Sequence, residues 1–489
     1  MSRTRRYWVA IGWLWLATSL ASAQTLIDPE LSVTEIVEGL STPTAMAFIG
    51  ADDILVLQKN DGLVRRVLNG VLQPSSVLDV AVDQASERGL LGIAVHPAFP
   101  SAPWVYLYCT ESSTGGDTLG IPPPAGNRIY RFRWDGQALV EPVLLLDLPA
   151  IPGPNHDGGA MTFGPDGKLY AVIGDLNHRG QLQNVPSGPA ADDTSVVLRL
   201  NDDGTVPSDN AFFTLGGNLA KYYAYGIRNG FGLAFDPMTH KLWMTENGPD
   251  AYDEINLVEP GLNSGWVQIM GPVSRSPRGL DSLFQVPGSH YADPKFSWLD
   301  VVAPTAIVFL NSARLGAPYQ NDVFVGDFNF GRLYRFRPTP ARDGLSFVDP
   351  GLADLVLDAQ DDPAEIIFGT GFGGITDLKV GPDGRLYVLS FQGKIFALSQ
   401  ASAALQGLVT DQVTGAALDG VLVRGRRLEP PPAVQAHTRT DAAGAYTLGA
   451  LAPGRYSVFL TRSGYGAQWR HVQLLPGEIA TLDVQLPPR

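Results

Sequence analysis

The sequence predicts an all-β protein, and three observations support this fold class. One short pattern recurs along most of the chain: an apolar strand, a turn of Pro, Asp and Gly, and a second apolar strand. Its clearest copies are residues 164–170 and 381–387, which read GPDGKLY and GPDGRLY. The 489 residues include 54 Gly and 38 Pro, as expected where many short strands require many turns. Helical periodicity, in contrast, is scarce.

Looser copies of this pattern bring the total to six units. They occupy residues 46–56, 96–106, 235–243 and 320–325. Six similar units favour radial closure into a six-bladed β-propeller, because a closed ring leaves no long strand edge free. An array of β-sandwiches is the alternative. We place the propeller in residues 24–400.

The pattern stops between Ser399 and Ala404. Beyond this point, alternating strands such as residues 454–460 and 480–486 predict a small β-sandwich over residues 404–489. A segment of about 85 residues is long enough to form an independent domain.

The N-terminus has the pattern of a secretory signal peptide over residues 1–23. Arg3, Arg5 and Arg6 precede the apolar residues 7–20, and Ala-Ser-Ala then forms a small-residue cleavage site. The apolar stretch is too short for a membrane span, and no other apolar run approaches that length. The sequence therefore predicts a periplasmic or secreted protein with no membrane span after cleavage.

Charge and cysteine content restrict the partners and the means of stabilisation. The net charge of -14 becomes -17 when the three signal arginines are lost. Such acidity disfavours nucleic acid and anionic membranes as partners, but it suits Ca²⁺ or a basic electron-transfer protein. The one cysteine, Cys109, cannot form an internal disulfide and is expected to be a buried, inert thiol.

The most informative segment is residues 154–159, PNHDGG, which places His156 in a polar, glycine-rich turn. A further turn and an apolar strand then lead to Asp175. A general base needs such a pair, an imidazole that titrates near neutrality and a carboxylate that orients it. The structural alternative is that His156 caps the loop and Asp175 accepts hydrogen bonds from backbone amides.

The propeller region, roughly residues 35–398, resembles the glucose/sorbosone dehydrogenase family. Enzymes of this family are six-bladed propellers that oxidise sugars with pyrroloquinoline quinone (PQQ) and Ca²⁺. The resemblance rests on several motifs in the same order, namely residues 87–97, the His156 segment, and residues 173–175, 225–229, 246–249 and 253–257.

The resemblance implies a role for each matching residue. His156 would be the base that takes the proton of the anomeric hydroxyl, and Asp175 would orient it. Arg228 would bind the quinone oxygen and stabilise its negative charge, and Asn229 would help to hold the cofactor.

The resemblance also implies a calcium site. Gly248 and Pro249 would offer main-chain carbonyls to a Ca²⁺ ion that bridges the cofactor, since this ion prefers oxygen ligands. Asp253 and Glu254 would support the site, or alternatively form a solvated acidic turn.

The cofactor site departs from the family pattern at the residues that bind the PQQ carboxylates. Asn329 stands where the family has a lysine, and Gly374 and Thr376 replace two arginines. Glu87 replaces a glutamine near the cofactor, and Asn155 replaces an aspartate before the histidine. Loss of three cations removes charge-assisted hydrogen bonds.

Two interpretations of these departures remain open. Either the chain binds PQQ weakly or in a shifted pose, or the pocket takes another ligand. Arg179, Arg332 and Lys379 are nearby cations that would compensate for the loss.

The C-terminal region resembles the carboxypeptidase regulatory-like, transthyretin-type β-sandwich through residues 407–411, 440–446 and 451–456. Such modules are usually non-catalytic. Its histidines, His437 and His471, lack metal-ligand spacing.

Together these observations predict an exported quinoprotein dehydrogenase that oxidises an aldose sugar at the anomeric carbon. We expect a periplasmic electron acceptor and a monomer or dimer. The alternatives are a non-enzymatic extracellular propeller that binds a ligand or glycan and a Ca²⁺-dependent hydrolase, for which no clear ligand set is seen. Two long loops, residues 110–126 and 273–287, are expected at the channel mouth.

Overall fold

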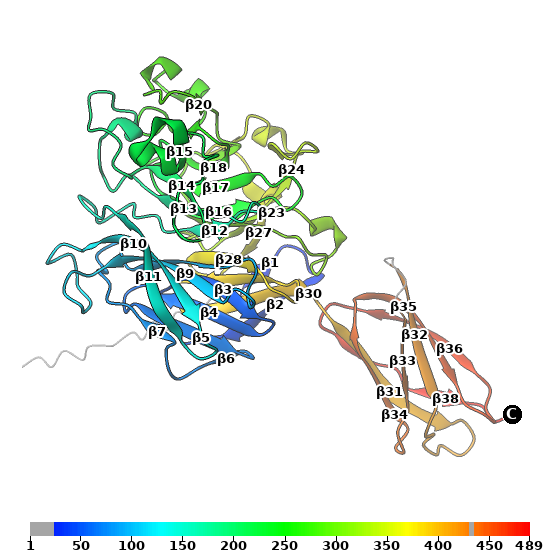
Figure 1. Cartoon of the computed structure of the whole chain (residues 1–489). Helices are drawn as coiled ribbons and strands as arrows, with labels where there is room; N and C mark the ends of the chain where they lie inside the picture. The colour runs from blue at the N-terminus through cyan, green and yellow to red at the C-terminus, as the bar shows by residue number, and fades with distance from the viewer. Residues whose placement is uncertain (1–23, 430–434) are drawn as a thin grey trace, which may run out of the picture.

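The computed structural model describes residues 24–429 and 435–489 (Figure 1). The predicted signal peptide, residues 1–23, lies outside the described residues. Within these residues six sheets form a propeller and two further sheets form a C-terminal sandwich, which confirms the predicted fold class. The described part contains no helix of the length and hydrophobicity that crossing a bilayer requires.

The first three blades follow one another along the chain. Blade 1 contains β3 (Pro43–Gly50), β4 (Asp53–Gln58), β5 (Leu63–Leu68), β6 (Val71–Leu72) and β7 (Leu78–Asp79). Blade 2 contains β8 (Leu90–Val95), β9 (Trp104–Glu111), β10 (Gly126–Trp134) and β11 (Leu139–Leu148). Blade 3 contains β12 (Met161–Phe163), β13 (Leu169–Ile173), β14 (Val196–Leu200), β15 (Tyr222–Tyr225), β19 (Leu262–Asn263) and β20 (His290–Tyr291).

The other three blades include strands from distant parts of the chain. Blade 4 contains β16 (Gly230–Phe235), β17 (Leu242–Glu246), β18 (Asp253–Val258), β21 (Phe296–Trp298) and β26 (Val356–Leu357). Blade 5 contains β22 (Pro304–Phe309), β23 (Val323–Asp327), β24 (Leu333–Pro338), β25 (Leu345–Ser346), β27 (Ile367–Thr370) and β1 (Thr25–Leu26). Blade 6 contains β28 (Ile375–Val380), β29 (Leu386–Ser390), β30 (Lys394–Gln400) and β2 (Leu31–Val37).

The ring closes in two ways. Each innermost strand contacts the innermost strand of the next blade, and β28 of blade 6 returns to β3 of blade 1. In addition, the N-terminal strand β2 pairs antiparallel with β30 and so completes the last blade. The two ends of the propeller are therefore joined by main-chain hydrogen bonds, and no blade stands at an open end.

The repeated hairpin explains why the blades form. In both clear copies the turn Gly has positive φ, +72° at Gly167 and +79° at Gly384. The turn aspartate accepts a hydrogen bond from the tyrosine that follows it, at 3.0 Å from Tyr170 to Asp166 and 3.1 Å in the second copy. The same few residues thus form the turn and fix the strand after it.

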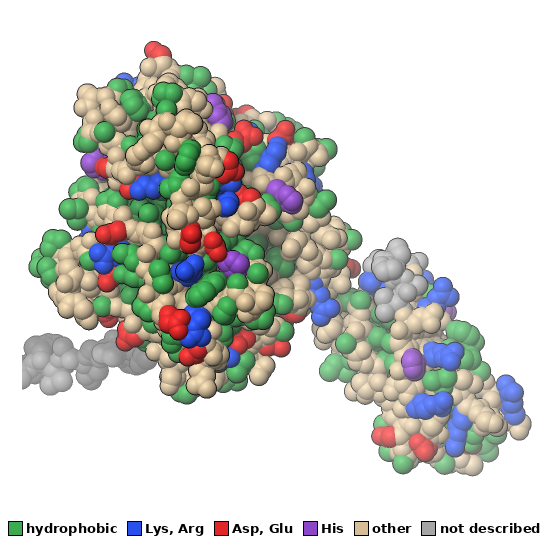
Figure 2. Space-filling model, in the orientation of Figure 1, with side chains coloured by type: hydrophobic (Ala, Val, Ile, Leu, Met, Phe, Trp, Pro, Cys, Tyr) green, Lys and Arg blue, Asp and Glu red, His purple; other side chains and the backbone are tan. Residues whose placement is uncertain are grey.

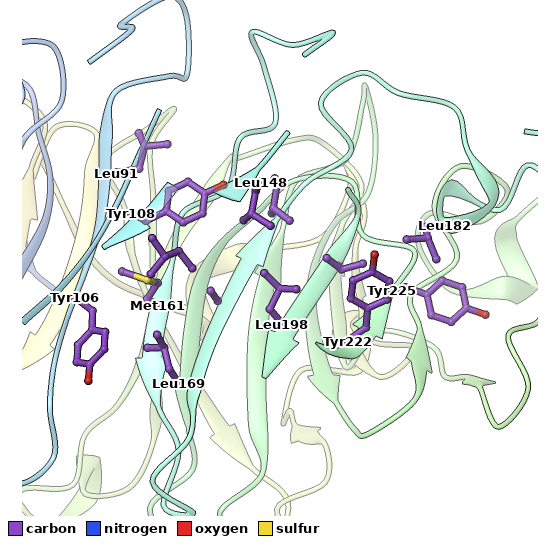
Figure 3. Close-up of a cluster of buried hydrophobic side chains, with 14 of the residues drawn as sticks. Leu91, Tyr106, Tyr108, Leu148, Met161, Leu169, Leu182, Leu198, Tyr222 and Tyr225 are labelled. Atoms are coloured by element: carbon purple, nitrogen blue, oxygen red, sulfur yellow. The ribbon is translucent and has the colours of Figure 1, made fainter. Parts of the chain in front are cut away.

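Hydrophobic packing lies between the blades. Each pair of neighbouring blades encloses one cluster of buried apolar side chains. Figure 3 shows the cluster between blades 2 and 3, in which Tyr106 and Tyr108 lie opposite Leu169 and Leu198. Cys109 lies in the cluster between blades 1 and 2, and burial raises its thiol pKa to about 12, as expected for an inert thiol.

The C-terminal sandwich has a core of its own. One sheet contains β31 (Ala403–Asp411), β34 (Ala445–Leu451), β37 (Ile479–Thr481) and β38 (Val484–Leu486). The other contains β32 (Leu422–Glu429), β33 (Gln435–Arg439), β35 (Gly454–Thr461) and β36 (Gln468–Leu474).

Short 3₁₀ turns are the helical elements of the described chain. They are η1 (Gln181–Gln183), η2 (Phe213–Leu215), η3 (Gly217–Lys221), η4 (Val273–Arg275), η5 (Leu280–Ser282), η6 (Ala317–Tyr319), η7 (Pro350–Leu352) and η8 (Pro363–Glu365).

Candidate functional site

The topology brings the predicted site residues to one end of the central channel. In an up-and-down blade, the loop before the first strand and the loop after the second strand open at the same end. His156 and Arg228 lie in loops before the first strands β12 and β16, whereas Asp175 directly follows the second strand β13. Residues far apart in the sequence therefore meet at one mouth of the channel.

His156 and Asp175 form a buried, directly hydrogen-bonded pair. His156 Nδ1 lies 2.5 Å from Asp175 Oδ1, and the residues are 7% and 2% exposed. The same carboxylate also accepts hydrogen bonds from Trp266 Nε1 at 2.6 Å and from the Asn177 main-chain N–H at 2.7 Å. Three donors thus fix the carboxylate, which in turn fixes the imidazole.

The loop backbone holds this pair in place. His156 has a positive φ of +66°, a conformation that non-glycine residues adopt rarely and often at functional sites. A side chain at Gly174 would place its Cβ 2.5 Å from the His156 carbonyl oxygen and 2.4 Å from that of Arg228. Glycine at this position therefore permits the loops that carry His156 and Arg228 to approach each other.

Glu87 joins two of the predicted site residues. Its Oε2 accepts hydrogen bonds from the His156 main-chain N–H at 2.6 Å and from Asn229 Nδ2 at 3.1 Å. The family has a neutral glutamine at this position. In this chain two N–H groups of the protein donate hydrogen bonds to the charged carboxylate.

Arg228 lies beside the pair. Its Nη1 donates to the Asn247 carbonyl oxygen at 2.9 Å, and its guanidinium lies 5.3 Å from the centre of the Trp266 ring. Burial lowers the pKa of Arg228, and the carboxylates of Asp175 and Glu87 oppose this shift. Because an arginine side chain stays protonated, the site keeps a half-buried positive charge.

Two buried carboxyl groups behind the site titrate near neutrality. Burial raises the pKa of Glu246 to about 7, although its Oε1 accepts the Arg228 main-chain N–H at 2.7 Å. Burial likewise raises the pKa of Asp157, the residue after His156, to about 7. Glu254 lies opposite Glu246 in the sheet, and its pKa is raised well above the usual value.

The predicted calcium segment follows β17. Gly248 is buried, and its N–H donates to Asp253 Oδ1 at 2.8 Å, whereas Pro249 is exposed. The other Asp253 oxygen accepts the main-chain N–H groups of Val302 and Ala303 at 2.6 and 2.7 Å. Asp253 therefore ties the segment to blade 5.

The described residues contain no group of three or more His, Cys, Asp or Glu side chains arranged for a metal ion. A Ca²⁺ ion in this segment would depend on main-chain carbonyl oxygens, which are suitable hard ligands.

A cavity of about 310 Å³ lies along the channel next to the site, and all six blades contribute to its lining. Glu87 and Asn247, which hold His156 and Arg228, form part of its wall. Two cations also line it, Lys59 and Lys379. Most of the remaining lining is apolar and includes Leu91, Ile93, Met161, Phe231, Leu233, Ile307, Phe328 and Phe391.

The three positions at which the family's cations are replaced lie in blades 5 and 6, and one of them lines the cavity. Thr376 lines the cavity, and its hydroxyl donates to the Pro43 carbonyl oxygen at 2.9 Å. Asn329 is exposed and donates to the Val301 carbonyl oxygen at 3.3 Å, so its side chain is directed to the loop before β22. A Cβ at Gly374 would lie 3.0 Å from the Phe328 ring, which occupies the adjoining space.

Of the three cations expected to compensate, one lines the cavity. Lys379 does so, although its Nζ also pairs with Asp377 at 2.7 Å. Arg179 lies over the Trp266 ring at 5.5 Å, and Arg332 lies over the Phe330 ring at 4.6 Å.

Sequence reasoning missed Lys59 and Trp266. Lys59 follows the second strand of blade 1, and burial lowers its pKa against the attraction of Asp157, Glu87 and Asp83. The loops after the second strands open at the end of the channel that holds the site, so this position in the blade could have identified Lys59 from the sequence. Trp266 lies 91 residues from Asp175 in the chain, and no local pattern connects them.

Comparison with known proteins agrees with the fold. The glucose/sorbosone dehydrogenase family matches residues 40–396, and the carboxypeptidase regulatory-like domain matches residues 404–487. The aldose sugar dehydrogenase of Escherichia coli is 27% identical over 388 residues, which cover 76% of this chain and 93% of that protein.

Solved structures share the propeller. A putative oxidoreductase (glucose dehydrogenase) of Thermus thermophilus has a TM-score of 0.59 and 29% identity, covering 75% of this chain and 99% of that one. The PQQ-bound aldose sugar dehydrogenase of Streptomyces coelicolor has a TM-score of 0.56 and 24% identity, covering 76% and 99%. The chain therefore belongs to the glucose/sorbosone dehydrogenase family and carries a carboxypeptidase regulatory-like domain at its C-terminal end.

Proposed function

We propose that this protein is an exported quinoprotein dehydrogenase that oxidises an aldose sugar at its anomeric carbon with PQQ and Ca²⁺. The observation that carries the proposal is the His156–Asp175 pair, held at 2.5 Å next to a channel cavity and beside the half-buried Arg228. The E. coli relative, named as an aldose sugar dehydrogenase, supports the substrate class.

The geometry suits His156 for removal of the proton from the sugar's anomeric hydroxyl. Asp175 accepts the Nδ1 proton, which leaves the lone pair on Nε2. The hydrogen bonds among the described residues use Nδ1 of His156 and leave Nε2 for a substrate. Asn177 and Trp266 hold the carboxylate, so the imidazole keeps the tautomer that a base requires.

Arg228 would stabilise negative charge at the oxidant. Its Nη1 is held by the Asn247 carbonyl, whereas its buried Nε has no partner among the described residues. When bound, PQQ supplies the two-electron acceptor that oxidation of the sugar to a lactone requires. A fixed positive charge in a buried site favours the charge that this reduction creates.

The residues around the cavity fit an anionic, planar cofactor. Asn229 Oδ1 and Asn247 Oδ1 are buried without partners among the described residues, so both oxygens can accept hydrogen bonds from a ligand. Lys59 and Lys379 would take the carboxylates in place of the family's lysine and arginines. Phe328 would contribute an apolar surface for the ring system.

Gly248 and Pro249 would hold Ca²⁺ through their carbonyl oxygens, as the family resemblance implies. We further propose periplasmic or secreted location, a periplasmic electron acceptor, and a monomer or dimer. The pattern of residues 1–23 supports export.

A binding protein without enzymatic activity is the second candidate. The observation in its favour is the loss of cations at Asn329, Gly374 and Thr376, near which the cavity is lined by Phe328 and by Lys379 that already pairs with Asp377. Such a protein would bind a ligand in the cavity without any contribution from His156 to chemistry.

The test is a titration of the mature chain with PQQ in the presence of Ca²⁺, followed by calorimetry and by aldose-dependent reduction of a dye. We expect stoichiometric binding and dye reduction. Absence of PQQ binding at tens of micromolar would contradict the dehydrogenase and favour the binding protein.

A further inference from the structure

The outer face of one sandwich sheet is exposed and unusually basic. The outer face consists of the outward side chains of β33, β32, β35 and β36. Strand register places Arg424 between His437 and Phe459, and Phe459 next to Trp469. The neighbouring row places Arg426 between Gln435 and Ser457, with His471 beyond.

An aromatic pair lies in this face. The rings of Phe459 and Trp469 have centroids 4.3 Å apart and planes inclined by 38°, and Trp469 is 62% exposed. A tryptophan is rarely left so open to water on a strand that could carry a polar residue. The exposed indole face is available to stack on a flat, partly apolar ligand.

Two arginines of the outer face form no ion pair with another side chain that the structure describes. These are Arg424 and Arg426, and both are exposed. A third exposed arginine, Arg455, lies opposite Glu429, the last residue of β32, in the strand register. The outward positions of these four strands carry Arg424, Arg426, Arg439, Arg455, His437 and His471, and the strands contain one acidic residue, Glu429 at the end of β32. Figure 2 shows basic side chains spread over the visible face of this domain.

The two domains therefore differ in charge. Residues 404–489 contain 8 arginines and 6 acidic residues, a net charge of +2, whereas residues 24–403 contain 24 basic and 43 acidic residues, a net charge of -19. A cationic surface retained on a strongly acidic protein points to an anionic partner for this domain alone.

We infer that the outer face binds an acidic polysaccharide, a glycan whose sugar rings carry carboxylates. Trp469 would stack on a sugar ring, and the forked guanidinium groups of Arg424 and Arg426 would bind carboxylates. Gln435 and Ser457 add neutral groups suited to sugar hydroxyls.

Other anionic partners fit less well. Nucleic acid carries one charge per about 1.7 Å of duplex, and the propeller's acidity would repel so dense a charge. A membrane surface would be repelled for the same reason. A uronate chain has at most one charge per sugar, and the mixture of aromatic, neutral and basic groups on the outer face matches it better.

The experiment measures binding of the full mature chain to polygalacturonate by calorimetry, at two salt concentrations. Dextran, a dT oligonucleotide and phosphatidylglycerol vesicles are the comparison ligands. We expect binding to polygalacturonate that weakens with salt, and none to dextran.

Variants locate the site. Trp469→Ala and the double variant Arg424→Ala/Arg426→Ala should each weaken binding by about tenfold or more. Arg462→Ala is the matched control, because this arginine lies over the Tyr465 ring and outside the outer face. All variants should unfold at the wild-type temperature.

Three results would overturn the inference: no binding of polygalacturonate, equal binding by the variants, or tighter binding of the oligonucleotide or vesicles. Because the propeller's dye reduction is measured separately, failure here leaves the proposed oxidation untouched.

Discussion

The two walls of the central cavity have different chemistry. On the side of blades 2–4, Glu87 and Asn247 line the cavity and hydrogen-bond to His156 and Arg228, which lie outside the lining. The side of blades 5 and 6 presents Phe328, Phe391, a threonine whose hydroxyl already donates a hydrogen bond, and Lys379 paired with Asp377. The groups that we propose for proton transfer are thus held together, whereas those that would anchor an anionic cofactor differ from the family pattern. A fold can keep one half of a site while changing the other.

The largest effect should come from the polar wall. His156→Asn removes the base, and dye reduction with saturating PQQ should fall by about 100-fold or more. Binding of PQQ, measured by calorimetry, should change little. His240→Asn is the matched control, since His240 has a positive φ of +59° in an exposed turn. Unchanged activity in His156→Asn would contradict the role of the pair.

The second prediction concerns the lysines that would replace the lost cations. The double variant Lys59→Met/Lys379→Met should weaken PQQ binding by about 100-fold, because two charge-assisted contacts are lost. Calorimetry without substrate measures this directly. Lys394→Met, which breaks an exposed pair with Glu35, is the control. Wild-type affinity in the double variant would mean that other residues anchor the cofactor.

A smaller effect should follow from removing one of the hydrogen bonds that hold the His156–Asp175 pair. Trp266→Phe removes the indole donor 2.6 Å from Asp175, and kcat should fall by about tenfold. The pH profile of kcat should also move, because the carboxylate that orients the imidazole loses a donor. A fall in activity with an unchanged profile would indicate general damage to the cavity instead.

Adding a cation to the apolar wall should have a modest opposite effect. Asn329→Lys places a positive charge in the exposed loop beside Phe328, and PQQ should bind about threefold more tightly. Titration calorimetry at low and high salt would show the gain and its screening. No gain would place the cofactor carboxylates away from blade 5.

The smallest effect concerns the pH dependence of protein stability that arises from Glu246. The folded pKa of Glu246, about 7, lies above its unfolded value, so its native form favours the proton. Its contribution to stability is full below the unfolded pKa and is lost as pH rises through 7. The melting temperature should therefore fall by about a few degrees between pH 5 and 8. Glu246→Gln should flatten this slope, whereas Glu141→Gln, an exposed control, should not.

Sequence patterns predict the blades well because each hairpin is local. The turn at Asp166 needs only residues within a few positions. His156 and Asp175 are also detectable, since each stands at a fixed place relative to a first or second strand. The roles of Lys59 and Trp266 depend on contacts across the ring, and sequence spacing does not encode them. Asn329 shows the reverse case: its position in the sequence matches the family's lysine, but its side chain hydrogen-bonds to the loop before β22.

The pairing of β2 with β30 also sets the order in which this domain can form. Ser32 and Ser399, which face each other in that pairing, are 367 residues apart. β2, the first strand of blade 6 to be synthesised, therefore cannot pair until β30 has been synthesised. Until residue 400 is available, the propeller is an open arc whose terminal blades expose unpaired edges. Such long-range pairing slows folding, so a chain truncated before β30 should fail to complete the domain.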